Sequence, residues 1–465
     1  MIELELLGQI LSLMMFFSII GVLMLGYPVA FSLAGVSLFY AGVGYYFGVF
    51  DPSNLTSLAS RYAGIMLNEV LVAVPLFIFM GMMLERSGIA EKLLITMGRM
   101  FGTLRGGLGL SVIVVGALLA ASTGIVGATV VTMGLLSLPA MMRAGYDPRL
   151  ASGVICASGT LGQIIPPSTV LIFMGDMLSG INAQVQMSMG NFAPTPVSVG
   201  DLFAGAFVPG LLLIALYMTW MVIKAIKDPQ SCPALEVTEE ERRNLWKDVI
   251  TSLVPPLILI FAVLGSILGG IATPTESASV GAVGAMLLAA LRKRLTLTNL
   301  RQVMLATGNT TTMIFVILLG ASVFSLVFRM MGGDELVSDF LNSLPGGKMG
   351  AILFVMLLMF LLGFILDTFE IIFIVLPITA PILLMMGVDP IWLGVMVAVN
   401  LQTSFLTPPF GFSLFYLRGV APGAVSTRMI YEGALPFVVL QLIAIGILIA
   451  FPQLVTWLPN LLYGR

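Results

Sequence analysis

Apolar residues along this chain gather into long runs that short polar stretches separate, and many runs are long enough to cross a bilayer. Ordinary spans are expected at residues 6–25, 28–50, 70–84, 203–223, 249–268, 277–291, 310–330 and 433–458. The runs at residues 89–104 and 297–305 are expected to lie along the membrane surface, the first because it carries charges among its apolar positions. The pattern predicts an all-α polytopic membrane protein.

Two further apolar runs, residues 150–178 and 392–417, each contain two adjacent prolines. The first holds Gly162-Gln163-Ile164-Ile165-Pro166-Pro167-Ser168, and the second holds Thr403-Ser404-Phe405-Leu406-Thr407-Pro408-Pro409-Phe410-Gly411. Proline donates no backbone hydrogen bond and clashes with the preceding turn, so each pair should interrupt its helix inside the membrane. Because the freed backbone groups need partners in protein or in a cavity, each break is a candidate ion or substrate site.

The two breaks belong to an internal repeat. Pro408 follows Pro166 by 242 residues, and the same offset relates Gly387-Val388-Asp389-Pro390 to Gly145-Tyr146-Asp147-Pro148 and Pro381 to Pro139. In each copy a pair of short apolar runs precedes the break. Residues 107–121 and 127–142 flank Ser122-Thr123-Gly124, and residues 351–366 and 369–386 flank Asp367-Thr368. We expect two re-entrant hairpins; for the first, two thin spans are the alternative.

Basic residues predict the orientation of the repeat. Lysine and arginine gather in residues 224–248 and 292–301, which are expected in the cytoplasm, whereas residues 180–200 contain neither and are expected outside. Hairpin one then opens inward and hairpin two outward, so the copies are inverted. Inverted repeats with two discontinuous helices are the architecture of secondary transporters.

The expected organisation follows the repeat and separates a scaffold from a transport domain. Residues 1–69 supply N-terminal scaffold helices, and residues 181–310 supply connecting loops and further scaffold helices. Residues 70–180 and 311–420 are repeats one and two, each with its hairpin and broken helix, and together form the transport domain. Residues 421–465 supply a C-terminal scaffold helix.

The amino-acid composition excludes several classes of function. Of 465 residues, 58% are hydrophobic and only 9% are charged, against roughly 25% charged in soluble domains, and the net charge of −2 suggests no nucleic-acid partner. The chain has no histidine, only two cysteines and no P-loop, so histidine-based catalysis, a metal cluster and ATP hydrolysis are not expected, and neither is a cofactor. The N-terminus lacks the basic start of a cleaved signal peptide, so its first apolar run should be retained.

Hydroxyl side chains gather at the hairpin tips and at the breaks. Helix ends expose carbonyl groups, which together with hydroxyls suit Na⁺, and N–H groups, which suit a carboxylate. The residues concerned are Ser122, Thr123 and Thr129 at tip one, Ser168 and Thr169 at break one, Thr368 at tip two, and Thr403, Ser404 and Thr407 at break two. The alternative interpretation is helix capping and close packing.

Acidic residues inside apolar runs need a partner or a cavity. Asp367 and Glu370 stand at tip two with the spacing of a capping box, and that structural role does not exclude a nearby cation. Thr273 or Thr275 is suited to cap a helix that has Glu276 in its first turn. Asp176 and Asn400 are weaker candidates.

Several motifs together resemble those of a known family. They are Pro75-Leu76-Phe77-Ile78-Phe79-Met80-Gly81, Met142-Arg143-Ala144-Gly145-Tyr146-Asp147, both proline-broken stretches, and residues 270–276. In this order they resemble the large membrane (M) subunit, DctM-like, of tripartite ATP-independent periplasmic (TRAP) transporters. The resemblance implies an elevator-type fold in the bacterial inner membrane and Na⁺-coupled import of small organic acids such as carboxylates or 2-oxo acids.

The resemblance also implies partners and site residues. The partners are a periplasmic substrate-binding protein and a small four-helix membrane subunit, which is expected as a separate chain. Tip one with break one would hold one Na⁺, and tip two with break two another. The Na⁺ candidates are Ser122, Thr123, Gly124, Gly162, Pro166, Asp367, Thr368, Thr403, Thr407, Pro408 and Gly411, and the substrate candidates are Thr129, Gln163, Ser168 and Ser404, with Glu276 and Glu370 as structural or coupling acids.

Tip one departs from the pattern usual in the family, Gly-Ser-Ser-x-Ala-Thr, and reads Ser122-Thr123-Gly124-Ile125-Val126-Gly127-Ala128-Thr129. The alternative function is a stand-alone Na⁺- or H⁺-coupled organic anion permease of the same architecture. A membrane enzyme is not expected without histidine or a catalytic cluster.

Overall fold

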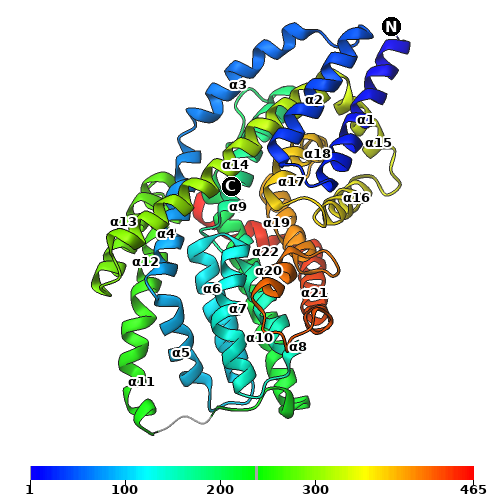
Figure 1. The fold of residues 1–465 in the computed structure, drawn as a ribbon. Helices are drawn as coiled ribbons and strands as arrows, with labels where there is room; N and C mark the ends of the chain where they lie inside the picture. Colours follow the sequence, from blue (N-terminus) through cyan, green and yellow to red (C-terminus); the bar gives the residue numbers. More distant parts are fainter. Residues whose placement is uncertain (1, 236–238, 465) are drawn as a thin grey trace. The chain divides into compact units, whose positions relative to one another are not determined.

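The computed structural model describes residues 2–235 and 239–464, apart from the side chains of residues 2, 122–123 and 239–244. Over these ranges the secondary structure is helical, with no β-strand (Figure 1). The chain divides into two compact units. The first comprises Met1–Leu71, Phe173–Ser198 and Asn309–Leu393, and the second comprises Val72–Ile172, Val199–Gly308 and Gly394–Arg465. The scaffold and transport domains expected from the sequence follow other boundaries and stay a prediction.

The first unit holds α1 (Ile2–Met24), α2 (Val29–Tyr46), the 3₁₀ turn η1 (Pro52–Thr56), α3 (Ser57–Met66), α15 (Gly333–Ser343), α16 (Gly347–Leu362), α17 (Thr368–Ile374) and α18 (Leu376–Met385). The second holds α4 (Ala73–Arg86), α5 (Ile89–Phe101), α6 (Gly107–Thr123), α7 (Val126–Arg143), α8 (Pro148–Thr160), η3 (Leu161–Gln163), α10 (Val199–Lys227), η4 (Pro229–Ser231), α11 (Glu239–Ser252), α12 (Val254–Leu268), α13 (Pro274–Leu291), α20 (Phe412–Val420), α21 (Thr427–Ala450) and α22 (Gln453–Tyr463). Residues of η2 (Val70–Val72), α9 (Thr169–Ser188), α14 (Leu297–Met330) and α19 (Pro390–Leu406) belong to both.

Apolar helices dominate the described part of the chain. Eight are long and apolar enough to cross a bilayer, and two bent helix pairs raise the number to ten when each pair counts as one span. Seven of the predicted ordinary spans coincide with or overlap these eight helices, and the eighth, residues 70–84, lies in a bent pair. The chain is therefore a multi-pass membrane protein.

Two predicted boundaries are wrong because helices include polar positions, and helices also form in a polar stretch for which the sequence predicted no element. The polar stretch after residue 50 forms η1 and α3, since the Asp51 carboxylate accepts a hydrogen bond from the Ser53 N–H at 2.9 Å and starts a helix there. The predicted surface helix and span at residues 297–330 form one helix, α14, because the isolated Gly308 weakens a helix without ending it. The charged loop after residue 227 contains α11, while residues 236–238 lie outside the described ranges.

Two other predicted helices are shorter than expected because of proline. The predicted last span ends as α21 at Ala450, and Pro452 precedes a separate helix, α22. The second arm of hairpin two bends by 57° between α17 and α18, where Pro377 occupies the first turn of α18. Proline favours a helix start and removes the hydrogen bond that would continue the preceding helix.

Both proline pairs interrupt their helices, as predicted. The first break lies between η3 and α9, and the second between α19 and α20. In both, the bond between the two prolines is cis. The two interrupted helices also start alike, because Asp147 and Asp389 each precede a proline and accept a hydrogen bond from the first turn, from the N–H groups of Arg149 at 2.7 Å and Trp392 at 2.8 Å. The shared caps are the structural counterpart of the repeated Gly-x-Asp-Pro sequence.

Equivalent positions of the two copies meet inside the second unit. The amide of Gln402 donates to the Thr160 hydroxyl at 3.2 Å, and these residues are separated by the repeat offset of 242. A local two-fold axis brings a residue to its own equivalent, whereas a translated copy would not. The contact therefore supports a local two-fold relation between the two interrupted helices, and their inversion in the membrane stays a prediction.

This contact extends into a fully buried polar cluster formed by Thr160, Tyr217, Gln402 and Gln441. The Tyr217 hydroxyl accepts from the amides of Gln441 at 2.8 Å and Gln402 at 3.5 Å. The cluster joins α8, α10, α19 and α21. Since buried polar groups are costly without partners, these bonds fix how the four helices pack.

In the first unit, aromatic contacts connect hairpin two with α9. The ring of Phe173 lies edge-on to Phe373 with centroids 5.1 Å apart and to Phe369 at 5.6 Å. Phe369 and Phe373 lie on one face of α17, four residues apart, which is the spacing that aligns helical neighbours. The helix that follows break one therefore packs against the second arm of hairpin two.

We expect Tyr217→Phe to destabilise the protein, because it removes the shared acceptor of two buried amides and costs about 1–3 kcal/mol. The measurement is the apparent Tm of the purified protein in detergent. Thr219→Val is the matched control, since Thr219 is an exposed hydroxyl of the same helix that bonds only to the Ala215 carbonyl. Equal Tm values for the two variants would contradict a structural role of the cluster.

Candidate functional site

A serine hydroxyl bridges the two sides of break one. Between η3 and α9 the chain runs through residues 164–168, and the Ser168 hydroxyl donates to the Gln163 carbonyl at 2.9 Å across the two prolines. The side chains of Gln163 and Ser168 are both buried, and the Gly162 backbone lies against Ala120 of α6. Three of the predicted residues of break one are thus together in the core of the second unit.

Tip one meets break one directly. Gly124 ends α6 in the left-handed conformation, with φ of 61°, and its carbonyl accepts a hydrogen bond from the Thr169 hydroxyl at 3.0 Å. A Cβ at Gly124 would lie 3.0 Å from the Thr169 nitrogen, so the backbone approach is close. Tip one and break one are therefore in contact, and the Na⁺ that the family resemblance assigns to them stays a prediction.

The other predicted residues of tip one are less informative. Thr129 is buried and its hydroxyl donates to the Ile125 carbonyl at 3.1 Å, within the first turn of α7. The side chains of Ser122 and Thr123 lie outside the described part of the structure, so their predicted role as Na⁺ ligands stays a prediction. Hairpin one itself is formed by α6 and α7, which pack against each other.

At break two the chain turns back toward the helix that precedes it, and a serine hydroxyl again bridges the two sides of the break. The Ser413 hydroxyl donates to the Phe405 carbonyl at 2.7 Å, and a Cβ at Gly411 would lie 2.6 Å from the same oxygen. Only glycine therefore permits the chain to turn back here. Pro408 supplies the break, and Gly411 supplies the space.

The hydroxyls predicted at break two turn toward their own helix. Thr403 donates to the Val399 carbonyl at 2.9 Å, Ser404 to Leu401 at 2.8 Å and Thr407 to Thr403 at 2.7 Å. These bonds fit the capping and packing alternative. Each hydroxyl oxygen keeps lone pairs, so the bonds do not exclude coordination of a cation.

Both breaks lie in the second unit, and the helix before break one contacts the helix after break two. The Cys156 thiol of α8 lies 3.6 Å from the Ser413 carbonyl of α20. The α20 helix also covers hairpin one, because Cβ atoms at Gly127 and Gly134 would approach the side chains of Tyr416 and Leu417. Pairwise contacts thus connect tip one with break one and α20 with hairpin one and α8. We call tip one, break one and break two together the break junction.

Tip two has the capping box that the sequence predicts. The Asp367 N–H donates to the Glu370 carboxylate at 3.0 Å, and the Asp367 carboxylate accepts from the Thr368 N–H at 2.6 Å. Thr368 and Glu370 are buried. Tip two belongs to the first unit and break two to the second, so the Na⁺ site predicted to join them stays a prediction.

The remaining acids have structural partners. Thr273 and Glu276 form a reciprocal capping box at 3.2 and 2.8 Å, on an exposed turn before α13. The Asp176 carboxylate accepts from the Asn68 amide at 2.8 Å inside the first unit. Asn400 is buried in α19. The predicted cap at Glu276 is confirmed, which favours a structural role there.

The break junction offers neutral oxygen atoms rather than charged ligands. Carbonyls of Gly124, Gln163 and Phe405 each accept a hydrogen bond from a hydroxyl group, and a carbonyl oxygen can accept more than one such contact. Over the described residues, no group of three or more histidine, cysteine, aspartate or glutamate side chains is placed to hold a metal ion. Oxygen donors without sulfur or imidazole suit hard cations such as Na⁺ rather than transition metals.

Sequence reasoning missed Ser413, Tyr217 and Gln441. Ser413 follows the prolines of break two closely, as Ser168 follows those of break one, and this was an available signal. Tyr217 lies in an otherwise apolar span, where a polar group requires a partner, but the sequence did not indicate which partner.

Comparisons with known proteins agree with the geometry. Residues 16–454 match the family described as "Tripartite ATP-independent periplasmic transporter, DctM component". The chain is 30% identical to the C4-dicarboxylate TRAP transporter large permease protein DctM of Vibrio cholerae, over 97% of this chain and 98% of that protein. It is 27% identical to the sialic acid TRAP transporter large permease protein SiaM of the same organism, over 96% and 98%.

The fold also resembles a solved structure. The Alcanivorax borkumensis YdaH transporter superimposes with a TM-score of 0.61, covering 89% of this chain and 90% of that one, at 16% identity. These similar proteins are transporters rather than enzymes. The chain belongs to the DctM family and is the large permease subunit of a tripartite ATP-independent periplasmic transporter.

Proposed function

We propose that this subunit translocates small organic acids across the bacterial inner membrane and couples their import to Na⁺. The observation that carries the proposal is the break junction, where the Thr169 hydroxyl bonds to the Gly124 carbonyl of hairpin one and the Ser168 hydroxyl bonds to the Gln163 carbonyl. The names of two similar proteins specify C4-dicarboxylates and sialic acid, which are both organic acids. A carboxylate substrate for this chain accords with those names.

The chemistry follows from the ends of the broken helices. Carbonyl and hydroxyl oxygens at the breaks would hold Na⁺, and the positive N-terminal end of α9 or α20 would face the substrate carboxylate. A bound cation reduces the cost of placing an anion nearby in a low dielectric. Binding of the ion and binding of the acid would therefore be mutually favourable, and that is the coupling free energy a symporter needs.

The proposed assembly includes a small membrane subunit and a periplasmic substrate-binding protein that delivers the acid. An elevator-type movement of the hairpin-bearing repeats is the transport step that we propose. The stand-alone permease is the less favoured alternative, because the matching family is that of a tripartite transporter.

The tripartite proposal predicts that this chain, reconstituted with its small subunit in liposomes, takes up the organic acid only when both the binding protein and an inward Na⁺ gradient are present. The measurement is uptake of radiolabelled acid, with K⁺ replacing Na⁺ as the control. Uptake without any binding protein would reject the tripartite proposal and support the stand-alone permease.

Thr169→Val should weaken Na⁺ activation, because it removes the bond between break one and the tip-one carbonyl. A typical net hydrogen-bond contribution corresponds to a rise of roughly two- to tenfold in the Na⁺ concentration that gives half-maximal uptake. Thr219→Val serves as the control for a hydroxyl lost elsewhere in the unit. An unchanged Na⁺ dependence in Thr169→Val would contradict the role of this contact.

Asp367→Asn and Thr407→Val test tip two and break two. Each is expected to lower Na⁺-dependent uptake more than it lowers the amount of protein in the membrane, since each removes an oxygen donor near a helix end. Uptake is compared with membrane abundance measured by immunoblot. Unchanged Na⁺ activation in both variants would remove these residues from the site.

A further inference from the structure

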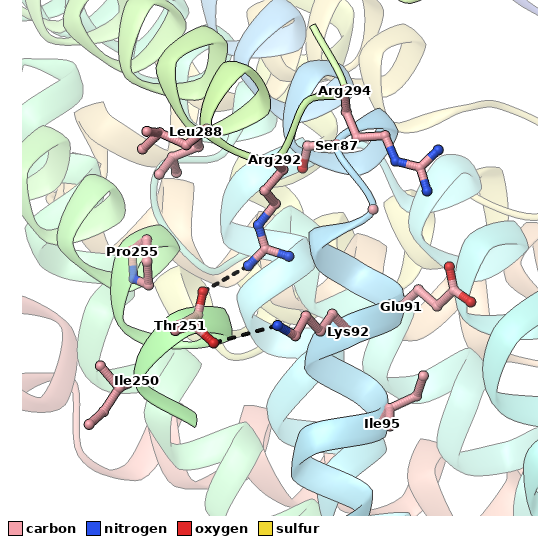
Figure 2. Close-up of a pocket in the computed structure, with 12 residues that line it drawn as sticks. Ser87, Glu91, Lys92, Ile95, Ile250, Thr251, Pro255, Leu288, Arg292 and Arg294 are labelled. Atoms are coloured by element: carbon pink, nitrogen blue, oxygen red, sulfur yellow. Dashed lines mark hydrogen bonds between the residues drawn. The ribbon is translucent and has the colours of Figure 1, made fainter. Parts of the chain in front are cut away.

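A cavity in the second unit is lined by residues outside the break junction. Its volume is about 710 Å³, and the ends of α4, α11 and α13 and the starts of α5 and α12 surround it. Figure 2 shows Lys92 and Arg292 pointing toward Thr251 from different elements, whereas Arg294 and Glu91 point away from it. Nothing in the transport proposal uses these side chains.

The cavity lies at the expected level of the membrane surface. The apolar helix α13 ends at Leu291, immediately before Arg292, Lys293 and Arg294. These basic residues are expected on the cytoplasmic side, where lysine and arginine are concentrated in membrane proteins. The cavity is therefore expected at the boundary between the hydrocarbon and the headgroups of the cytoplasmic leaflet.

Positive charge exceeds negative charge in the cavity. Three basic side chains line it, Lys92, Arg292 and Arg294, against one acidic side chain, Glu91. The Lys92 ammonium lies 3.9 Å from Asp248, a carboxylate that also lies 3.7 Å from Arg99 and is thus shared. Shared pairing at such distances neutralises Lys92 only in part.

The two arginines have no carboxylate partner among the described residues. One Nη of Arg292 donates to the Thr251 carbonyl at 2.9 Å, which is a neutral acceptor. The Lys92 ammonium reaches the Thr251 hydroxyl at 3.5 Å. Lys92 and Arg292 are thus held close together at one residue, and both keep donors for an anion.

The rest of the lining is apolar and open. Ile95, Ile250 and Leu291 line the cavity and are 47%, 59% and 80% exposed, and Leu288 and Pro255 lie beside them. A soluble phosphate or carboxylate would gain nothing from such a surface. A lipid would cover it with its acyl chains while its phosphate meets the basic groups.

We propose that this cavity binds the headgroup of an anionic phospholipid of the cytoplasmic leaflet, with Lys92 and Arg292 as the phosphate ligands. Basic pockets between membrane helices on the cytoplasmic side suit such headgroups. The lipid would link α5, which packs against α6 of hairpin one, to α11 and α13. The site is independent of the proposed ion and substrate sites.

The test is native mass spectrometry of the purified full chain with added phosphatidylglycerol or phosphatidylcholine of the same acyl chains. We expect preferential retention of phosphatidylglycerol. Arg292→Gln and Lys92→Gln should each weaken its binding roughly fivefold, the effect of one basic residue near an anionic headgroup. Lys293→Gln is the matched control, because it removes the same charge from the same basic cluster but does not line the cavity.

Three results would overturn the proposal. They are equal binding of the two lipids, an equal loss in Lys293→Gln and Arg292→Gln, and displacement of phosphatidylglycerol by inorganic phosphate at the same concentration, which would identify a soluble anion as the ligand. Lys92→Arg is a second control. It changes the side chain at position 92 but keeps its positive charge, so it separates loss of charge from a disturbed fold. It should retain binding, and a fivefold loss in Lys92→Arg would also count against the site.

Discussion

A peptide group inside a bilayer has no water to bond with, and the two proline pairs of this chain release several such groups at membrane depth. Hydroxyl side chains donate hydrogen bonds to backbone carbonyls near the breaks: Ser168 to Gln163, Thr169 to Gly124 and Ser413 to Phe405. Since a carbonyl oxygen has two lone pairs, a hydrogen bond from a hydroxyl group does not exclude contact with a cation. The same bonds that make the breaks tolerable in lipid therefore prepare the proposed Na⁺ site.

The duplication is accompanied by divergence where equivalent positions of the two interrupted helices are in contact. Thr160 and Gln402 occupy equivalent positions and touch, in a fully buried space that Tyr217 and Gln441 complete. Two glutamines at these positions would add volume to a packed core, and two threonines would leave a void, each at a cost in stability. A short and a long side chain fill the space and bond to each other.

Local chemistry made part of the architecture predictable. Proline interrupts a helix through its own ring, and the Asp367–Glu370 and Thr273–Glu276 boxes depend on a spacing of three residues, so the sequence contained each of these features. Features that depend on distant partners were not predictable. Tyr217 bonds to residues 185 and 224 positions away, and α14 continues through Gly308 although local propensity allows it to end there.

The basic cluster after α13 also shows a feature that the sequence could not predict, which is the direction of each side chain in a turn. In the sequence, Arg292, Lys293 and Arg294 are equivalent indicators of a cytoplasmic loop. In the structure, Lys293 adopts the left-handed conformation with φ of 58°, which turns the chain between its neighbours. Arg292 and Arg294 then line the cavity while Lys293 does not. Orientation in the membrane requires only the number of basic charges, whereas binding of a phosphate requires their direction, and one backbone angle separates the two roles.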